Sequence, residues 1–331
     1  MVQPLVSLCM STHSAPELFP RSLAGLLAQT YANLEILVLV NGGNPKALEI
    51  LEGIKDPRLR WFVQKPAYSM ERAFNEIVGK VAGKYYLFCS DDDILLTGAV
   101  DRQVALLEQH PNVGFCHADF ANVDDDGKIL NTWISHKGTW IMAKEESWPL
   151  FLTRTRCCFQ ATVVRTEFWK KVGGFDEAVG NPVDNSLYLK LLQFSDVGHV
   201  SGVVCHYRVR TRSPDSWERQ FRNSQEFYAL SKKHLDLPPS FLRSGSGKAL
   251  LKRLRRRSLI DACQLIATTE DEEKIRNVRS WIETTVIPEN KGYRAWRAVL
   301  QRRDWMKLLR KMNAWDNRAR GIARSLLHKS S

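Results

Sequence analysis

The feature of this sequence that most constrains its fold is a regular alternation of apolar, strand-length runs with segments of helical periodicity. The segments occur, in the order strand, helix, strand, helix, strand, helix, strand, at residues 5–10, 17–29, 34–40, 45–54, 59–63, 70–81 and 85–89. Strands that are separated by helices usually pair in parallel, and the helices then cover both faces of the sheet. The N-terminal part of the chain therefore predicts an α/β fold built on a mostly parallel sheet flanked by helices.

Small polar residues follow three of the predicted strands, at positions 11–14, 41–44 and 90–93. In open α/β sheets, ligands bind in the crevice at the carboxyl ends of the strands, so we expect these groups to converge on one site. Neither a GxGxxG sequence after the first strand nor a GxxxxGK[ST] sequence is present, which argues against a dinucleotide-binding fold and a P-loop. Small polar groups combined with acids favour a nucleotide diphosphate and its metal ion.

Three consecutive carboxylates, Asp91, Asp92 and Asp93, follow the apolar run 85–89 almost directly. Like charges packed at the end of a buried strand are costly unless a cation or hydrogen-bond donors neutralise them. Mg²⁺ and Mn²⁺ prefer carboxylate oxygens and commonly share their coordination shell with substrate phosphates. The triplet therefore predicts a Mg²⁺ or Mn²⁺ site, and the alternative is a solvated acidic turn.

Composition limits the class of protein. A chain of 331 residues holds either one large α/β domain with an extension or two domains. The longest uninterrupted apolar runs, such as Ile36–Val40, are too short to span a membrane, and the N-terminus has no signal-peptide pattern. The seven cysteines show no CxxC or Cys/His ligand spacing. We therefore expect reduced cysteines and a cytoplasmic protein.

Four segments together resemble a known family. In order, they are PLVSLCMSTHS, SLAGLLAQTYANLEILVLV, AFNEIVGKVAGKYYLFCSDDDIL and VGGFDEAVGNPVDNSLYLKLL. Their order and spacing resemble those of family 2 glycosyltransferases of the GT-A fold, and the resemblance covers residues 4–212. It implies a Rossmann-like catalytic domain over residues 1–215. It also implies metal-dependent, inverting transfer of a sugar from a nucleotide-sugar donor, with a UDP-sugar as the favoured donor.

The resemblance assigns the nucleotide-sugar pocket to residues at the ends of the first two strands. Ser11 and His13 would line the base and ribose pocket, and Asn41 would contact the base. Asn41 stands where the family usually has an aspartate; its amide still accepts a hydrogen bond from a pyrimidine N3–H, but it also donates one. For His13, the alternative is a residue that merely precedes a helix.

The resemblance also assigns the acid motif, residues 90–93. Asp92 would bind the metal, and Asp91 would bind the ribose or belong to the metal shell. Asp93 is expected to be a spectator. Ser90 stands where many relatives have an aspartate, as in a Thr-Asp-Asp variant of the motif.

The catalytic base of the family matches Asp184, which would take the proton of the acceptor hydroxyl. Val183 replaces the glutamate that usually precedes this base, so one carboxylate remains. The alternative for Asp184 is a helix N-cap. Arg210 stands where the family often has a histidine; arginine cannot ligate a cation, but its guanidinium suits a diphosphate.

Between the acid motif and the predicted base, the sequence is less informative. Residues 124–127, DDDG, predict a hairpin-like turn that is solvated and is not a second metal site. Residues 128–147 predict irregular structure. Trp133, Trp140 and Trp148 in or beside this region either line an acceptor channel, because sugars stack on aromatic rings, or pack in the core of a mixed sheet.

The C-terminal part, residues 216–331, is predicted to be helical and basic. From residue 291 onward, 12 Lys and Arg stand against two acids, whereas the first 290 residues hold 36 basic and 34 acidic side chains. Basic amphipathic helices with tryptophans suit an anionic membrane surface, which would place the protein peripherally on the cytoplasmic face. The alternatives are packing on the catalytic domain and, less favoured, nucleic-acid binding.

We therefore expect a glycosyltransferase that moves a sugar to a hydroxyl of a glycan or lipid-linked glycan acceptor during cell-surface polysaccharide assembly. One alternative is a nucleotidyltransferase that activates a sugar phosphate, but residues 11–20 lack the glycine-rich, basic loop that such an enzyme needs after its first strand. The other is a non-catalytic scaffold or nucleic-acid-binding protein that uses the basic tail, which would need neither Asp92 nor Asp184.

Overall fold

The structure is a computed structural model of the chain. It describes residues 3–13, 17–134, 138–153, 157–178, 183–209, 216–235, 261–262, 265–266 and 269–286. The chain divides into two compact units, Met1–Ser213 and Pro214–Ser331.

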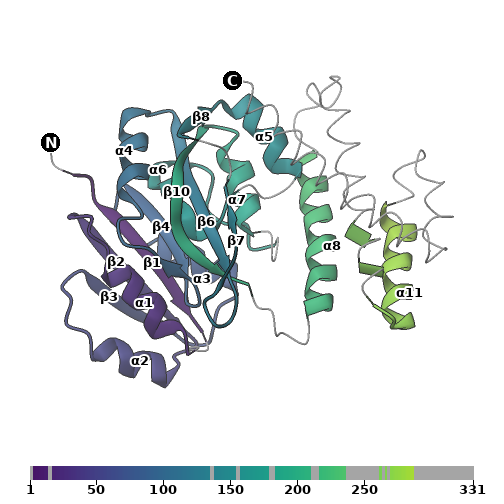
Figure 1. The fold of residues 1–331 in the computed structure, drawn as a ribbon, viewed down its shortest axis with the longest axis horizontal. Coiled ribbons are helices and arrows are strands. Elements are labelled where there is room, and N and C mark those ends of the chain that lie inside the picture. The colour runs from purple at the N-terminus through teal and green to yellow at the C-terminus, as the bar shows by residue number, and fades with distance from the viewer. Residues whose placement is uncertain are drawn as a thin grey trace. The chain divides into compact units, whose positions relative to one another are not determined.

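The first half of the N-terminal unit forms the predicted alternation. Its four parallel strands are β1 (Val6–Thr12), β2 (Leu34–Asn41), β3 (Leu59–Gln64) and β4 (Tyr85–Ser90), in the spatial order β3-β2-β1-β4. The connecting helices are α1 (Phe19–Leu27), α2 (Pro45–Glu52) and α3 (Met70–Val78) (Figure 1). The predicted α/β fold class is confirmed.

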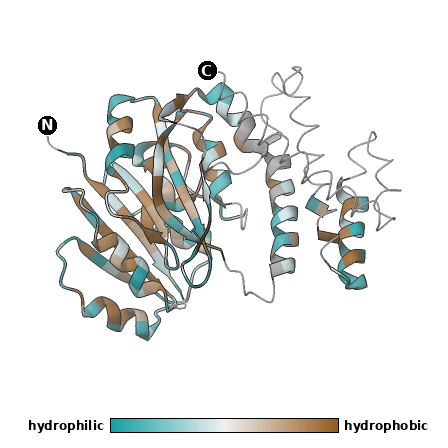
Figure 2. Cartoon of the chain, viewed as in Figure 1, coloured by the Kyte–Doolittle hydropathy of each residue, from teal (hydrophilic) through white to brown (hydrophobic). Residues whose placement is uncertain are grey.

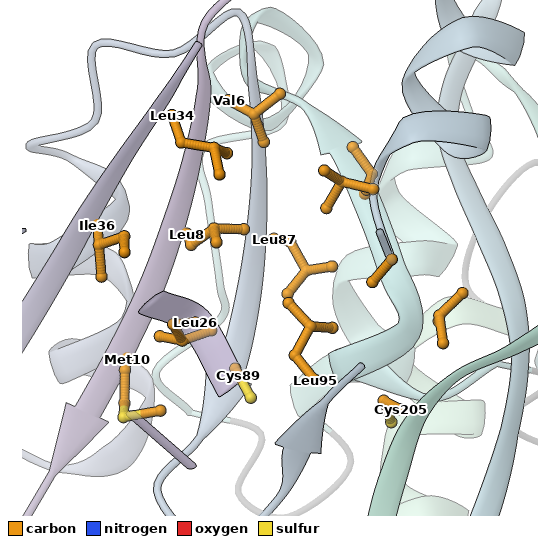
Figure 3. Close-up of a cluster of buried hydrophobic side chains, with 14 of the residues drawn as sticks. Val6, Leu8, Met10, Leu26, Leu34, Ile36, Leu87, Cys89, Leu95 and Cys205 are labelled. Atoms are coloured by element: carbon orange, nitrogen blue, oxygen red, sulfur yellow. The ribbon is translucent and has the colours of Figure 1, made fainter. Parts of the chain in front are cut away.

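Helices cover both faces of this part of the sheet. On one face, α1, α2 and α4 (Asp101–Gln109) share a core with alternate strand residues such as Leu8, Ile36 and Leu87 (Figure 3). On the other face, the ring of Phe74 in α3 lies 4.1 Å from the ring of Phe88 in β4, between centroids. Successive strand residues point to opposite faces. Because both faces are covered, the central strands are apolar along most of their length (Figure 2).

Local signals fix the helix starts and one sharp turn. The side chain of Asn44 accepts hydrogen bonds from the first N–H groups of α2, and Pro45 takes the first helical position, where no N–H is needed. Ser69 caps α3 with its hydroxyl oxygen. Before α2, Gly42 and Gly43 have φ values of +95° and +69°, which a side chain would strain. The loop after β2 is thereby held at the carboxyl edge of the sheet.

The second half of the unit extends the sheet with mixed pairing. The added strands are β5 (Ile94–Leu95), β6 (Val113–Val123), β9 (Thr162–Arg165) and β10 (Asp196–Arg208), and the order becomes β3-β2-β1-β4-β9-β6-β10-β5. β9 runs antiparallel between β4 and β6, β10 is parallel to β6, and β5 is antiparallel to β10. This half also contains α6 (Thr166–Lys171), α7 (Val183–Leu191) and a 3₁₀ turn at Phe159–Ala161. The last long strand, β10, therefore lies inside the sheet.

The described parts of 128–147, residues 128–134 and 138–147, contain regular elements, contrary to the expectation from the sequence. They contain β7 (Ile129–Trp133), which pairs with β6, and β8 (Trp140–Met142), which pairs with β10; α5 (Lys144–Thr153) begins at their end. These strands are too short to give a clear period-2 pattern. The conformation of β7 and β8 is therefore decided by pairing with the longer strands β6 and β10.

In the C-terminal unit, the structure describes α8 (Ser216–Leu235), α11 (Glu272–Trp281) and a π-helical turn at Ile282–Val286. A small apolar core joins these elements; it comprises Ala262, Leu265, Ile266, Ile275, Val278 and Ile282, with Trp217, Phe221, Tyr228 and Trp281 packed against it. The basic tail, 291–331, lies outside the described residues. Among the described helices, none combines the length and the apolarity that crossing a bilayer requires.

Candidate active site

The predicted polar groups meet at one edge of the sheet. β1 lies between β2 and β4, and Ser11 of β1 is in register with Leu39 of β2 and with Ser90 of β4. Because the three strands are parallel, their carboxyl ends lie side by side, which is where ligands bind in sheets of this kind. The residues expected to bind a nucleotide therefore adjoin the acid motif.

On the β1–β2 side, His13 and Asn41 lie together. The Nδ1 atom of the exposed His13 ring is 2.7 Å from the backbone oxygen of Asn41. Asn41 is buried, and its amide is engaged with the backbone of Tyr68: Nδ2 donates to the Tyr68 oxygen at 3.0 Å, and Oδ1 accepts from the Tyr68 N–H at 2.8 Å. The His13 ring is thus exposed at this end of the strands, whereas Asn41 anchors the loop that precedes α3.

That loop carries an aromatic residue that sequence reasoning missed. The Arg72 guanidinium carbon lies 4.2 Å from the centroid of the half-buried Tyr68 ring, a cation–π contact. Nucleobases pack readily against aromatic rings, so Tyr68 is a further candidate for the nucleotide pocket. No motif marks it, because a single tyrosine in a loop has no periodicity to recognise.

The three carboxylates of the acid motif have different surroundings. Asp91 and Asp92 are partly exposed, whereas Asp93 is buried, with 2% of its surface exposed. Asp93 accepts the backbone N–H of Arg208 at 2.7 Å. Burial, followed by the charge of Asp92, raises the pKa of Asp93 to about 8. Asp93 therefore ties the acid motif to the end of β10, and its expected absence from the metal and ribose contacts stays a prediction.

Arg208 places a cation next to the acid motif. Its Nη1 lies 3.5 Å from Asp92 Oδ2, and its Nε and Nη2 donate to Asp125 Oδ1 at 3.0 and 2.8 Å. The exposed fractions of these side chains are 13% for Asp92, 14% for Asp125 and 21% for Arg208. The expectation of a solvated turn at 124–127 is therefore wrong for Asp125, because the pairing of β6 with β10 brings this residue against the end of β10.

The donor set fits a hard divalent cation that is held jointly with a ligand. Asp91 and Asp92 offer carboxylate oxygens on the partly exposed side of the motif. Among the residues that the structure describes, no group of three or more His, Cys, Asp or Glu is arranged to hold a metal ion. Mg²⁺ and Mn²⁺ commonly take one or two protein carboxylates and complete their shell with substrate phosphates and water. Asp91 and Asp92 match that requirement in number and in chemistry.

Asp184 lies in the first turn of α7, which begins at Val183, so it is a helical residue and not the N-cap. Its carboxylate accepts the Asn185 N–H at 2.7 Å. Burial raises the pKa of Asp184 to about 6, although hydrogen bonds from backbone N–H groups partly offset this effect. A carboxylate with this pKa is still ionised at neutral pH and is a stronger base than an exposed one.

Tyr207 lies near both Asp184 and the acid motif. Burial raises the pKa of the Tyr207 hydroxyl, with smaller contributions from nearby ionisable groups that include Asp93, Asp184 and Asp92. The side chain nevertheless has 39% of its surface exposed. Tyr207 thus lies within electrostatic range of both the acid motif and the predicted base, and it still reaches solvent.

An aromatic row continues from Tyr207 across β6 to β7. The Tyr207 ring meets Phe120 of β6 edge-on, with centroids 6.1 Å apart, and Phe120 stacks on Trp133 of β7 at 6.0 Å. Beside the row, Asn122 Nδ2 donates to Asn131 Oδ1 at 2.8 Å. Aromatic rings together with amide groups form a surface that suits a polar ligand with apolar faces, such as a sugar.

The remaining candidate residues either pack elsewhere, lie outside the described residues, or join the site from another element. Trp140 stacks on the buried His199 of β10, so it packs within the sheet. Arg210 lies outside the described residues. Gln160, which sequence reasoning missed, donates from Nε2 to Ser90 Oγ at 2.6 Å and so joins the acid motif from the 3₁₀ turn before β9. No local pattern marks Gln160, because the contact depends on the order of strands in the sheet.

Comparison with known proteins identifies related sequences. Residues 7–169 match the model of the family described as Glycosyl transferase family 2. Chondroitin synthase of Escherichia coli is 26% identical over 212 residues, which cover 62% of this chain and 29% of the synthase. The chain thus spans less than a third of the length of that relative.

Two solved structures share the fold. TarS 1–349 of S. aureus, in complex with UDP-GlcNAc, superimposes with a TM-score of 0.56 at 12% identity, over 94% of this chain and 92% of that one. The mannosyltransferase PcManGT of Pyrobaculum calidifontis, in complex with GDP-Man and Mn²⁺, gives a TM-score of 0.54 at 15% identity, over 96% of this chain and 88% of that one. At these identities, the likeness establishes the fold alone.

Proposed function

Because the chain carries a glycosyltransferase family 2 domain of the GT-A fold, we propose that it transfers a sugar from a nucleotide-sugar donor to a hydroxyl of a glycan. The transfer would use a divalent metal ion and would invert the configuration at the anomeric carbon. One observation carries the proposal. The exposed His13 ring, the acid motif with Asp92, and the half-buried carboxylate of Asp184 belong to one unit, and Tyr207 lies within electrostatic range of both acids.

The donor side is formed by the carboxyl ends of β1 and β2. Ser11 and His13 would contact the base and ribose, with Tyr68 as an aromatic wall, while Asn41 positions the loop that carries Tyr68. A UDP-sugar is the favoured donor, and the TarS complex with UDP-GlcNAc supports a donor of this class. A GDP-sugar remains the competing donor, since PcManGT was solved with GDP-Man.

Asp92, with Asp91 beside it, would hold a Mg²⁺ or Mn²⁺ ion. The PcManGT complex contains Mn²⁺, which supports this choice of metal. When bound, such an ion neutralises charge on the diphosphate leaving group. The protein's own contribution is to place the partly exposed Asp92 carboxylate next to Arg208.

Asp184 would act as the general base. It would accept the proton of the acceptor hydroxyl while the oxygen attacks the anomeric carbon from the face opposite the leaving group. Its pKa of about 6 fits this task, because the carboxylate is ionised at neutral pH and yet basic enough to accept a proton. Holding donor and acceptor together in the crevice supplies a further part of the acceleration.

The acceptor would be a glycan, either free or attached to a lipid. The aromatic row formed by Tyr207, Phe120 and Trp133 supports this class of acceptor. Its exposed residue, Tyr207, lies within electrostatic range of Asp184. The similarity to a chondroitin synthase points the same way, toward an enzyme of polysaccharide assembly. The same proposal includes binding of the basic tail to a membrane surface, where the enzyme would act on its acceptor.

Donor binding tests this function most directly. In thermal unfolding, we expect a UDP-sugar with Mn²⁺ to raise the Tm of the full chain more than either one alone, because ligands that bind only the folded state stabilise it. GDP-mannose serves as the comparison donor. Asp92→Asn should lose the Mn²⁺-dependent part of the shift and keep the Tm of the unliganded protein. Donor binding that is the same with and without Mn²⁺, in both proteins, would refute the metal role.

A further inference from the structure

The Arg208 guanidinium is shared unequally between two carboxylates. Asp125 Oδ1 accepts two bonds from it, at 3.0 and 2.8 Å, whereas Asp92 Oδ2 lies 3.5 Å away, at the outer limit of a hydrogen bond. Arginine stays protonated at any ordinary pH, so the guanidinium remains a cation in all states of the site. Its position is therefore set more by Asp125 than by Asp92.

Asp125 is itself held by a well-defined turn. Asp124 Oδ1 accepts the N–H groups of Asp126 and Lys128 at 3.0 and 2.9 Å, and the Asp124 N–H donates to the Lys128 oxygen at 3.0 Å. Gly127 adopts a φ of +83°, which suits the tight connection from β6 to β7. The turn thus fixes the direction from which the Asp125 carboxylate reaches Arg208.

An arginine beside a metal-binding carboxylate competes with the metal for the carboxylate oxygens. A guanidinium in full contact with Asp92 would have to be displaced before a divalent cation could bind there, and that displacement would weaken the metal affinity. We infer that Asp125 is a positioning residue for the metal: it draws Arg208 to itself and so keeps the Asp92 carboxylate available to a divalent cation. The inference rests on the proposed metal role of Asp92.

Mn²⁺ binding tests the inference without any knowledge of the acceptor. In the full-length protein, we expect Asp125→Asn to weaken Mn²⁺ binding about tenfold in the presence of UDP, the lower end for loss of a group that orients a metal ligand. The electron paramagnetic resonance signal of free Mn²⁺ measures the affinity. Asp126→Asn is the matched control: it removes the same charge from the next residue of the turn, whose side chain is exposed, and it should bind Mn²⁺ as the wild type does.

A double-mutant cycle separates positioning from a simple loss of negative charge. If Asp125 acts through Arg208, then Asp125→Asn should have no further effect on Mn²⁺ affinity in an Arg208→Gln background. A direct charge effect would persist in that background. The Asp93 contact uses the backbone N–H of residue 208, which Arg208→Gln retains. Thermal unfolding checks each variant, and Arg208→Lys replaces Arg208→Gln if the latter does not fold, because a lysine cannot form both bonds to Asp125 in the same geometry.

The outcomes are distinguishable from a failure of the proposed function. Unchanged Mn²⁺ affinity in Asp125→Asn, an equal loss in Asp126→Asn, or an undiminished effect in the Arg208→Gln background overturns the inference. The metal role of Asp92 stands in each of these cases, provided that Asp92→Asn abolishes Mn²⁺ binding. A wild-type protein that binds no Mn²⁺, alone or with UDP, overturns both.

Discussion

At the scale of single residues, the site is a set of aspartates to which the surroundings give different roles. Asp93 is buried against the backbone of β10 and has a pKa of about 8, so it is largely protonated at neutral pH. Asp92 is partly exposed beside a guanidinium. Asp184 has a pKa of about 6 and is ionised at neutral pH. Different pKa values within one site are a common basis for dividing structural, binding and proton-transfer roles.

The proposed base can be tested by a substitution that keeps the size of the side chain. We expect Asp184→Asn to retain nucleotide-sugar affinity, measured by calorimetry, and to lose sugar transfer by at least about 10²-fold, because an amide cannot accept the proton. Asp176→Asn, in the turn before α7, is the control and should stay active. Full activity of Asp184→Asn together with loss in Asp176→Asn would move the base to that turn.

The raised pKa of Asp184 also makes stability depend on pH. Its folded-state pKa of about 6 lies above the ordinary value of 3.8, so the folded protein binds this proton more tightly than the unfolded chain. The resulting stabilisation is fully present below the ordinary pKa and is lost as the pH rises through the folded-state value. We therefore expect Asp184→Asn to raise Tm, relative to the wild type, more at about pH 7.5 than at about pH 5. A Tm difference that is independent of pH would contradict the raised pKa.

At the scale of elements, the sequence predicts the strands and helices that have a clear periodicity. It does not predict strands whose conformation depends on pairing with distant parts of the chain. The four strands and three helices of the first half follow from runs of five or more apolar or helix-periodic residues. β7 and β8 have five and three residues and take their conformation from β6 and β10. The same limit applies to the site: Asp92 follows a recognisable strand, whereas the contact of Asp125 with Arg208 exists only because β6 and β10 are neighbours.

The cap of α2 provides a test of one such local signal. Asn44→Ala removes the side-chain oxygen that accepts two N–H groups at the start of this helix. We expect the free energy of unfolding in urea to fall by about 1 kcal/mol, the usual cost of losing an N-cap. Lys46→Ala, at the exposed neighbouring position of the same helix, should change it by less than about 0.5 kcal/mol. Equal effects of the two substitutions would mean that the cap contributes no specific stability.

At the scale of the whole molecule, charge divides the chain into two parts. The first 290 residues are nearly neutral, with 36 basic and 34 acidic side chains, and the remaining 41 carry 12 Lys and Arg and two acids. The boundary between the two compact units falls after residue 213 of the chain, well before this excess of charge begins. The tail is thus a distinct feature within the second unit, and its role stays a prediction from the sequence.

We predict that the tail binds anionic membranes. Deleting residues from Lys291 onward should abolish co-sedimentation with vesicles that contain phosphatidylserine and leave donor binding intact, since each basic residue near such a surface contributes on the order of 1 kcal/mol. Added salt should weaken the full-length interaction by screening, and neutral vesicles serve as the control. Full-length protein that ignores anionic vesicles at low salt would favour packing of the tail on the enzyme and a soluble acceptor.

The position of β10 inside the sheet has a consequence for how the enzyme is made. The ribosome completes the acid motif at residue 93, but its neighbour in the folded site, Arg208, emerges more than a hundred residues later. At roughly 5–20 residues per second, that interval lasts on the order of ten seconds. During this time, Asp93 lacks the backbone group that it binds in the finished protein, and β6 has no β10 beside it. The surroundings of the acid motif are therefore among the last parts of the N-terminal unit to be assembled on the ribosome.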